Sequence, residues 1–470
     1  MEQSQNPVII GAGPAGLTAA LKLVERGVKP RIFESSGEVG GLARTGGRGE
    51  WRVDPGGHRF FTKSEEILDL WRSLLPADQW VAVQRSSAML VHGRFVQYPL
   101  VARDLIAQLG PRHALQGLGS FLWAKMGGAG GHDDSDSFRA WGEQEFGPYW
   151  YKMFFDGYVR KTWLADPEHI TSDWANQRIK PINWRLRKEP ELEELDAFLY
   201  PRLGPGQLWD AAAARLAEDG VMPELNTRVI KLGFDGETWT VYLDSGETVR
   251  TDAVFSTMPL RQLVEALDPA PPRAIRAMAA ALHHRSLITV AVALRTPLDA
   301  PYNWVYTPSR KLRVGRIQNY SRWSDALAPK DWKGSFLGLE YYTAPGDELC
   351  AADDETLKSI AHQDLHTLGI DESDIDQMMV ERLPFAYPIY DDARDRSVSY
   401  VRDYLTSHYP TLHPMGRNGT HHYDNQDHAM LSALRSVGLY FGEHVDPWQV
   451  NTDITYHESG LLNGEEQAAG

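Results

Sequence analysis

The chain has 470 residues, 42% hydrophobic and 24% charged, which is ordinary for a globular protein but too long for a single core. Its formal net charge of −15 argues against a general nucleic-acid binder, because such proteins need a basic face for phosphates. The one cysteine, Cys350, excludes an intrachain disulfide and has no Cys or His neighbour at metal-ligand spacing, so we predict no metal site. The N-terminus lacks a basic-apolar leader and no apolar run reaches roughly 18 residues, so we expect a cytoplasmic protein without a membrane span.

The first 34 residues have the pattern of a dinucleotide-binding βαβ unit. Residues 8–10 and 30–33 predict strands, and residues 17–23 predict a helix with Leu and Ala on one face. The GxGxxG loop from Gly11 to Gly16 provides a tight turn, a close approach for pyrophosphate and close helix packing, at a helix N-terminus that attracts phosphate. Glu34 ends the second strand, where its carboxylate can accept hydrogen bonds from ribose hydroxyls. This acid favours FAD or NAD over NADP.

The residues that follow Glu34 favour FAD. The run ESSGEVGGLART contains a Gly40-Gly41 turn, which lets main chain pass close to a cofactor, and Arg44, which can reach a phosphate. This run resembles the second flavin motif of the family that holds amine oxidases, protoporphyrinogen oxidase and UDP-galactopyranose mutase. The resemblance implies FAD as the cofactor.

A second glycine loop, VDPGGHRFF at residues 53–61, is expected near the isoalloxazine ring by the same resemblance. Gly56 and Gly57 lack side chains and can lie flat against the flavin, while His58 points at its reactive edge. The alternative for His58 is a histidine whose ring is satisfied by loop carbonyls.

The rest of the chain predicts an α/β fold: a Rossmann-type FAD-binding domain with an antiparallel-sheet substrate domain and a mostly helical insertion. The insertion is rich in Leu, Trp and Ala, with breaks at Gly110-Pro111 and in the glycine run 127–131. No second GxGxxG unit occurs, so a dedicated NADPH domain is not expected, although external NAD(P)H remains possible as electron donor. The predicted FAD-binding segments are 1–63, 201–282 and 401–470, with the helical insertion at 64–200 and the antiparallel β substrate domain at 283–400.

Several later segments resemble the UDP-galactopyranose mutases more narrowly, and nearly the whole chain takes part in the same order. The resemblance implies that Arg178 and Arg313 grip a nucleotide diphosphate, since guanidinium binds phosphate oxygens bidentately. The segments are residues 154–163 (FFDGYVRKTW), 174–179 (WANQRI), 313–321 (RVGRIQNYS), 386–391 (AYPIYD) and 416–428 (GRNGTHHYDNQDH).

The last of these segments precedes an apolar helical run, so it can cap that helix and aim its positive end at flavin N1 and O2. An anionic, reduced flavin is favoured there. The predicted catalytic residues are His58, Arg178 and Arg313. The predicted cofactor-binding residues are Gly11, Gly13, Pro14, Ala15, Gly16, Glu34, Ser35, Gly40, Gly41, Leu42, Ala43, Arg44, Gly56, Gly57, His58, Val229, Arg417, Asn425, Gln426 and Asp427. The predicted substrate-binding residues are Tyr158, Trp163, Arg178, Arg313, Tyr320 and Tyr423.

Two functions remain open for a small-molecule substrate. The mutase resemblance implies an isomerase on a nucleotide-linked sugar, in which N5 of reduced flavin acts on the anomeric carbon and the ring size changes without net redox change. The alternative is an oxidoreductase of the amine oxidase or protoporphyrinogen oxidase type, with an apolar or aromatic cage instead of the arginine pair. The chain departs from the larger mutases in lacking a two-residue spacer after Tyr423-Asp424, and its acidic stretch 191–199 does not match their uridine-binding asparagine.

Overall fold

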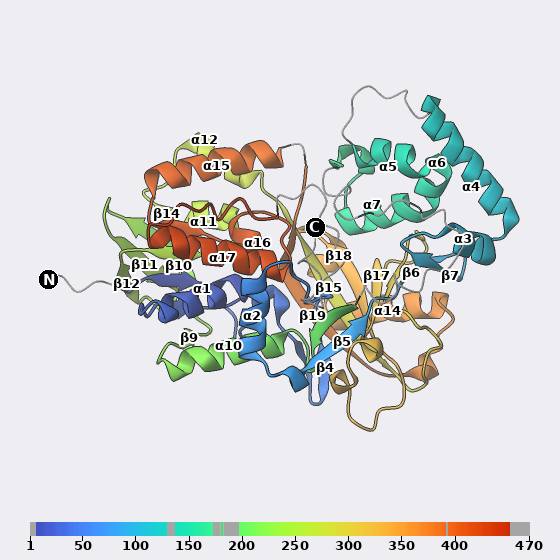
Figure 1. Ribbon diagram of the computed structural model, residues 1–470, viewed down its shortest axis with the longest axis horizontal. Coiled ribbons are helices and arrows are strands. Elements are labelled where there is room, and N and C mark those ends of the chain that lie inside the picture. Colours follow the sequence, from blue (N-terminus) through green and yellow to red (C-terminus); the bar gives the residue numbers. More distant parts are fainter. Residues whose placement is uncertain are drawn as a thin grey trace, which may run out of the picture.

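The computed structural model describes residues 6–128, 137–172, 179, 182, 197–391 and 393–451. Figure 1 shows two regions side by side: helices and sheets around α1 and α17 on the left, and a large sheet with a cluster of helices on the right. Within the described ranges, no helix combines the length and the apolar character needed to cross a membrane.

A five-stranded parallel sheet forms the centre of the first region, with the order β20-β13-β1-β2-β9. The strands come from the beginning, the middle and the end of the chain, so three distant segments build one sheet. Their bounds are β1 (Val8–Ile10), β2 (Arg31–Phe33), β9 (Pro223–Glu224), β13 (Val254–Ser256) and β20 (Leu412–Pro414).

Both faces of this sheet are covered, which explains why β1 is apolar throughout. Ile9 belongs to the core formed with α1, α10 and α17, whereas Val8 and Ile10 belong to the core on the other face. That second face carries the sheet β12-β11-β10-β14 and helices α11, α12 and α15. The bounds are α1 (Pro14–Glu25), α10 (Gly206–Glu218), α17 (Gln426–Tyr440), β10 (Val229–Phe234), β11 (Trp239–Leu243), β12 (Thr248–Thr251), β14 (Leu267–Asp268), α11 (Leu260–Ala266), α12 (Arg273–Ala280) and α15 (Arg394–His408).

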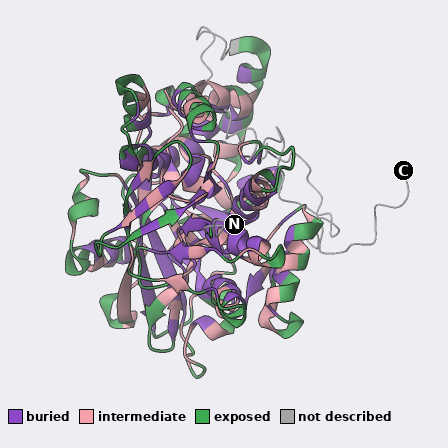
Figure 2. Ribbon diagram, turned by 90° about the vertical axis from the view of Figure 1, so that its left-hand side faces the viewer, coloured by how far each residue is buried: buried purple, intermediate pink, exposed green. Residues whose placement is uncertain are grey.

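A seven-stranded sheet, ordered β19-β15-β18-β17-β16-β6-β7, forms the second region. Its pairs are antiparallel except β16 with β6. The long central strands β15 and β18 are mostly apolar and almost entirely buried because both faces of the sheet are covered. Figure 2 shows that buried residues are concentrated in the interior of the molecule. The bounds are β6 (Ser87–Val91), β7 (Arg94–Tyr98), β15 (His284–Leu294), β16 (Trp304–Tyr306), β17 (Arg316–Asn319), β18 (Phe336–Thr343) and β19 (Ile375–Pro388).

The segment predicted as mostly helical also contributes strands, since β6 and β7 extend the second sheet and β5 (Trp80–Gln84) pairs with β8 (Ala197–Pro201). The expected break at Gly110 is present, with φ +82° between two helices. The helices in this segment are α2 (Glu65–Leu74), α3 (Ala102–Leu109), α4 (Pro111–Trp123), α5 (Phe138–Phe146), α6 (Pro148–Trp150) and α7 (Gly157–Trp163), with a π-helical turn, η4 (Tyr151–Asp156), between the last two.

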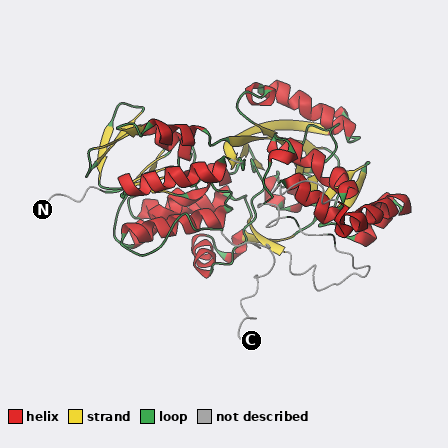
Figure 3. Cartoon of the chain, turned by 90° about the horizontal axis from the view of Figure 1, so that it is seen from above, coloured by secondary structure: helices red, strands yellow, loops and turns green. Residues whose placement is uncertain are grey.

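Two further helices, α14 and α16, contribute residues to the cavities described below, and α13 carries Glu348, the partner of Arg313. The bounds of these three helices are α13 (Glu348–Ala351), α14 (Asp354–Thr367) and α16 (Gly416–Gly419). Figure 3 shows helices beside the strands in both regions.

Candidate functional site

A groove of about 360 Å³ crosses the carboxyl ends of β1 and β2 and reaches the start of α17. Two glycines of the GxGxxG loop have no room for a side chain: a Cβ would lie 2.0 Å from Thr257 Oγ1 at Gly11, and 1.9 Å from the Gly11 carbonyl oxygen at Gly16. Gly13 differs, since it caps α1 with φ −83° and a Cβ there would lie 3.6 Å from the nearest atom, Gly41 Cα. The loop is therefore tight against the protein at two glycines and open at the third.

The Glu34 carboxylate joins the glycine loop to the end of β2. Its Oε2 accepts from the Ala12 amide at 2.8 Å, and its Oε1 accepts from the amide and the hydroxyl of Ser36, both at 2.8 Å. Arg44 also lines the groove, but its guanidinium pairs with Glu38 at 2.8 Å and donates to the Arg382 carbonyl. The arginine therefore has protein partners of its own.

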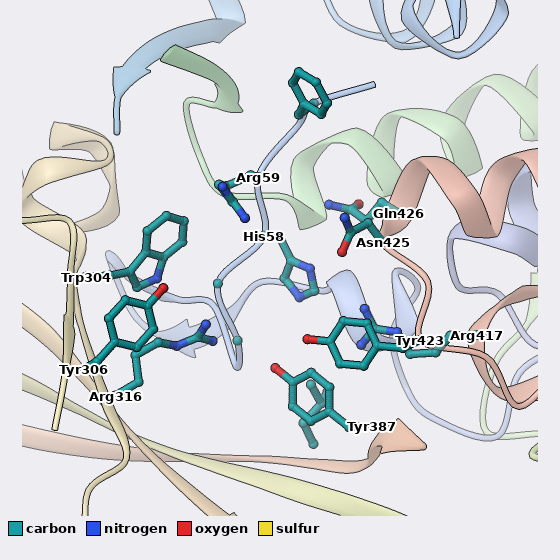
Figure 4. Close-up of a pocket in the computed structure, with 14 residues that line it drawn as sticks. His58, Arg59, Trp304, Tyr306, Arg316, Tyr387, Arg417, Tyr423, Asn425 and Gln426 are labelled. Carbon is teal, nitrogen blue, oxygen red and sulfur yellow. The ribbon is translucent and has the colours of Figure 1, made fainter. Parts of the chain in front are cut away.

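At one end the groove meets a smaller pocket of about 100 Å³, which we call the flavin-edge pocket. His58, Arg417, Asn425 and Gln426 line both cavities. Figure 4 shows the His58 imidazole at the centre of the flavin-edge pocket, with Arg59, Trp304, Tyr306, Arg316, Tyr387, Arg417, Tyr423, Asn425 and Gln426 around it.

His58 is neutral at working pH. Burial lowers the pKa of its imidazole to about 3, and the charge of Arg417 acts in the same direction. Its Nε2 is buried without a hydrogen-bond partner among the described residues, and so is Nε2 of Gln426. Unpaired buried nitrogens at the junction of two cavities fit a bound polar ring system, which would supply their partners.

The start of α17 points into this junction. Asn425 and His428 form a capping box, in which the Asn425 side chain accepts from the amide three residues on and His428 Nδ1 accepts from the Asn425 amide. The helix has 15 residues, so its N-terminus carries the partial positive charge expected of a full helix. The residues present thus fit FAD, with a glycine cradle for its phosphates and a helix N-terminus at the ring end.

The flavin-edge pocket is cationic and rich in tyrosine. Arg59, Arg316 and Arg417 line it, and no carboxylate occurs among its described lining residues. The rings of Tyr387 and Tyr423 stack at 5.4 Å between centroids, and the Arg417 guanidinium lies 5.5 and 5.3 Å from them. An anionic substrate group is therefore favoured here over a cationic one.

Arg316 is held by Glu340 on the neighbouring strand. Its Nε and Nη2 donate to the two carboxylate oxygens at 2.6 and 2.9 Å, and the Glu340 side chain is fully buried. Tyr306 stands opposite Arg316 in the β16–β17 pair, so both side chains share the pocket face.

A further arginine lies behind Tyr387. The Arg285 side chain is 3% exposed, its guanidinium lies 4.2 Å from the Trp163 ring and 5.0 Å from the Tyr387 ring, and no described carboxylate pairs with it. Burial lowers the pKa of Arg285. This buried cation adds to the positive potential around the pocket.

The predicted site residues are distributed unevenly. All predicted cofactor-binding residues line the groove or the flavin-edge pocket, except Gly16, Gly40 and Asp427. These three lie just beneath the lining. The Gly40 amide donates to the Ala12 carbonyl, and Asp427 is buried in the first turn of α17. Of the predicted substrate residues, Tyr423 lines the flavin-edge pocket, whereas Arg178 lies outside the described residues.

The structure places four other predicted substrate residues away from the described pocket lining. Arg313 is 46% exposed and pairs with Glu348. Tyr320 is fully buried and donates to the Asp54 carbonyl, and Trp163 is a buried ring in the core of the helical region. Tyr158 packs behind Tyr306, with 5.4 Å between ring centroids.

Seven residues that line the flavin-edge pocket were absent from the predicted site residues: Trp304, Tyr306, Arg316, Tyr387, Arg59, Phe61 and Leu383. The signal for the first three was the spacing Trp-x-Tyr followed ten residues later by Arg, which places alternate residues of two paired strands on one face. Tyr387 lies in the AYPIYD segment whose resemblance was noted without a role.

The loop that carries Gly56, Gly57 and His58 is anchored by a buried acid. Thr45 Oγ1 donates to Asp54 Oδ1 at 2.9 Å, and the Tyr200 hydroxyl donates to Asp54 Oδ2. Burial raises the pKa of the Asp54 carboxyl to about 7, against the effect of these two hydrogen bonds. The folded protein therefore takes up a proton here below neutral pH.

This uptake predicts a pH dependence of stability. The unfolded Asp ionises near pH 4 and the folded one near pH 7, so the free energy of unfolding falls by about 4 kcal/mol from pH 4 to 7 and the contribution is constant above. We expect Asp54→Asn to remove this dependence of the free energy of unfolding on pH, measured by urea unfolding between pH 4.5 and 8. The same dependence in the parent and the variant would contradict the raised pKa of Asp54.

The parallel sheet, the glycine loop and the groove define a dinucleotide-binding flavoprotein. The chain belongs to the family described as flavin-containing amine oxidoreductases, which it matches over residues 14–441. It is thus an FAD-dependent enzyme of that family.

Individual relatives are more distant. The chain is 27% identical to protoporphyrinogen oxidase 2, chloroplastic/mitochondrial, of Arabidopsis thaliana over 186 residues, which are 38% of this chain and 36% of the plant enzyme. It spans about a third or less of the length of the curated relatives that it matches.

Solved structures with a similar fold include a mutase and an amine oxidase. Reduced UDP-galactopyranose mutase superposes with a TM-score of 0.81 at 21% identity, covering 94% of this chain and 97% of that one. Cyclohexylamine oxidase from Brevibacterium oxydans IH-35A superposes with a TM-score of 0.63 at 13% identity, covering 93% and 99%. At these identities the likeness establishes the fold, and the site has to decide the chemistry.

Proposed function

We propose that the enzyme is a mutase-like isomerase that acts on a nucleotide-linked sugar with reduced FAD. The observation that carries the proposal is the lining of the flavin-edge pocket, with three arginines, three tyrosines and no described carboxylate. A diphosphate is the anion that such a set suits, because guanidinium groups bind phosphate oxygens in pairs and tyrosine hydroxyls donate to the remaining ones. A protonated amine would be repelled.

Bound FAD would supply the nucleophilic or redox chemistry, and the chain's own residues would position the substrate. Arg316 and Arg417 would hold the diphosphate, with Tyr306 and Tyr387 as neighbouring hydrogen-bond donors. His58 is neutral, so it can donate or accept one hydrogen bond at the flavin edge without adding charge. The N-terminus of α17 would favour a negative charge on the ring end of the cofactor.

The second candidate is an oxidoreductase acting on an anionic substrate. The family match and the similarity to protoporphyrinogen oxidase 2 favour it. The same arginines would then bind a substrate carboxylate, and electrons would pass to the cofactor and on to an acceptor.

One titration separates the two. The purified holoprotein is reduced with dithionite under anaerobic conditions and titrated with UDP, GDP and dTDP while the flavin absorbance is recorded. We expect saturable spectral changes with the reduced protein for at least one nucleotide, and conversion of the matching nucleotide sugar without oxygen uptake. Oxygen-consuming turnover of a carboxylate substrate, with no response to any nucleotide, would contradict the isomerase and support the oxidoreductase.

A further inference from the structure

A second cavity, of about 870 Å³, lies behind the seven-stranded sheet, and we call it the rear cavity. Alternate residues of the same strands separate it from the site: Trp304, Tyr306 and Arg316 line the flavin-edge pocket, whereas Val305 and Ile317 line the rear cavity. The two cavities share no lining residue, so the rear cavity is a separate space on the opposite face of the sheet.

The interior of the rear cavity is apolar. Val305, Ile317 and Leu337 form a floor on the sheet, and the walls come from β6–β7, the π-helical turn η4 and the end of α14. Figure 1 shows β6, β7, β17 and α14 together on the right of the molecule. Leu90, Phe95, Leu298 and Leu368 are only partly buried against the core here, so an apolar ligand would remove their surface from water. The volume is in the range of sites that take small molecules.

Two lysines give this apolar space a cationic rim. Lys152 on η4 and Lys311 in the β16–β17 connection line the cavity and are exposed, and neither takes part in an ion pair with a described residue. Asp299 is the one carboxylate in the described lining. In a chain with a net charge of −15, two unpaired lysines at the mouth of one cavity are a local reversal of sign.

We propose that the rear cavity binds an amphipathic small molecule, with a long hydrocarbon chain on the apolar floor and an anionic head group at Lys152 and Lys311. The apolar floor and the two lysines together point to one amphipathic ligand. A purely apolar molecule would not use the lysines, and a small anion would not use the floor. The combination fits a long-chain carboxylate or phosphate.

The test uses the holoprotein and a fluorescent fatty acid, dansyl-aminoundecanoate, whose emission rises and shifts to the blue in an apolar site. We expect saturable binding with one site per chain, displaced by oleate. Leu298→Trp fills the cavity and should lower the affinity for the probe at least about 10-fold, since its added ring takes the space of the probe's hydrocarbon chain. Replacing both Lys152 and Lys311 by Gln should lower the affinity for the probe about 5-fold, because each exposed charge contributes modestly.

Matched variants locate the site. Leu225→Trp adds the same ring at another partly exposed leucine, and Lys330→Gln removes an exposed lysine elsewhere, so both should bind the probe as the parent does. Tyr387→Phe alters the flavin-edge pocket and should also leave probe affinity unchanged. The lysine variant should lose affinity for oleate but not for oleyl alcohol, which has the same chain without the charge.

Three results would overturn the proposal. The first is an absence of saturable binding. The second is binding that Leu298→Trp leaves intact, which would place the probe elsewhere. The third is self-association in sedimentation that Leu298→Trp abolishes while no probe binds, which would make this face a contact between copies of the chain.

Discussion

We expect the Gly13→Ala variant to fold as the parent does and to lose most of its affinity for FAD. Gly13 has φ −83°, which any residue adopts, and a Cβ would make only an ordinary contact at 3.6 Å with Gly41 Cα. The same Cβ would occupy space at the N-terminus of α1 that the cofactor pyrophosphate needs. We expect the free energy of unfolding of the apoprotein to change by less than about 0.5 kcal/mol and FAD affinity to fall roughly 100-fold.

Gly16→Ala is the matched variant with the opposite outcome. Its Cβ would lie 1.9 Å from the carbonyl oxygen of Gly11, and side-chain rotation cannot relieve the contact, because the Cβ position is fixed by the backbone and the oxygen belongs to main chain. The free energy of unfolding of the apoprotein, measured by urea unfolding, should therefore fall by about 3 kcal/mol or more. Gly119→Ala, in open space on α4, controls for added methyl groups and should be neutral or slightly stabilising. Equal losses of stability at Gly13 and Gly16, or full retention of flavin by Gly13→Ala, would show that the loop does not hold the cofactor as described.

The second large effect is expected at Arg316. Arg316→Met leaves the buried carboxylate of Glu340 without its ion-pair partner, and such losses destabilise by about 3–5 kcal/mol. The double variant Arg316→Met/Glu340→Leu removes both charges and should regain most of that stability. Recovery is partial, because Gln318 and Tyr342 also donate to Glu340. The double variant should still fail to bind nucleotide diphosphates in the reduced state, although its stability is largely restored.

Arg313→Met provides the control, three residues earlier, in the connection that leads into β17. Its guanidinium pairs with an exposed Glu348, and such pairs contribute about 0–1 kcal/mol, so both stability and nucleotide binding should stay close to the parent's. Loss of binding in Arg313→Met, with binding intact in the Arg316 double variant, would assign the anion to the arginine that the sequence had suggested. Stability is measured by urea unfolding and binding by flavin absorbance.

The prediction of the cofactor half of the site rests on local determinants. The first strand, the glycine loop, the helix and Glu34 lie within 34 consecutive residues, and each glycine has a conformational or steric reason that the spacing reveals. The start of α17 was predictable for the same reason, since a cap and an apolar run are adjacent in sequence.

The substrate half depended on tertiary structure. Arg313 lies in the connection before β17 and Arg316 is the first residue of that strand, and the pairing of Tyr306 with Arg316 across β16–β17 decides which of them faces the pocket. A shift of one residue in strand register reverses the face of every side chain, and the spacing Trp-x-Tyr followed ten residues later by Arg does not by itself set that register. Tyr320 and Trp163 had the right residue types, but packing against distant segments made them core.

The flavin-binding class and the glycine and capping contacts follow from residues that lie close together in the chain. Tertiary structure was needed to join three distant segments in the parallel sheet, to decide which arginines and tyrosines meet at the flavin edge, and to form a second, apolar cavity behind them. The pocket face of Tyr306 and Arg316 depends on the register of β16 with β17, and the cavity also requires pairing of strands more than 200 residues apart, such as β6 and β16.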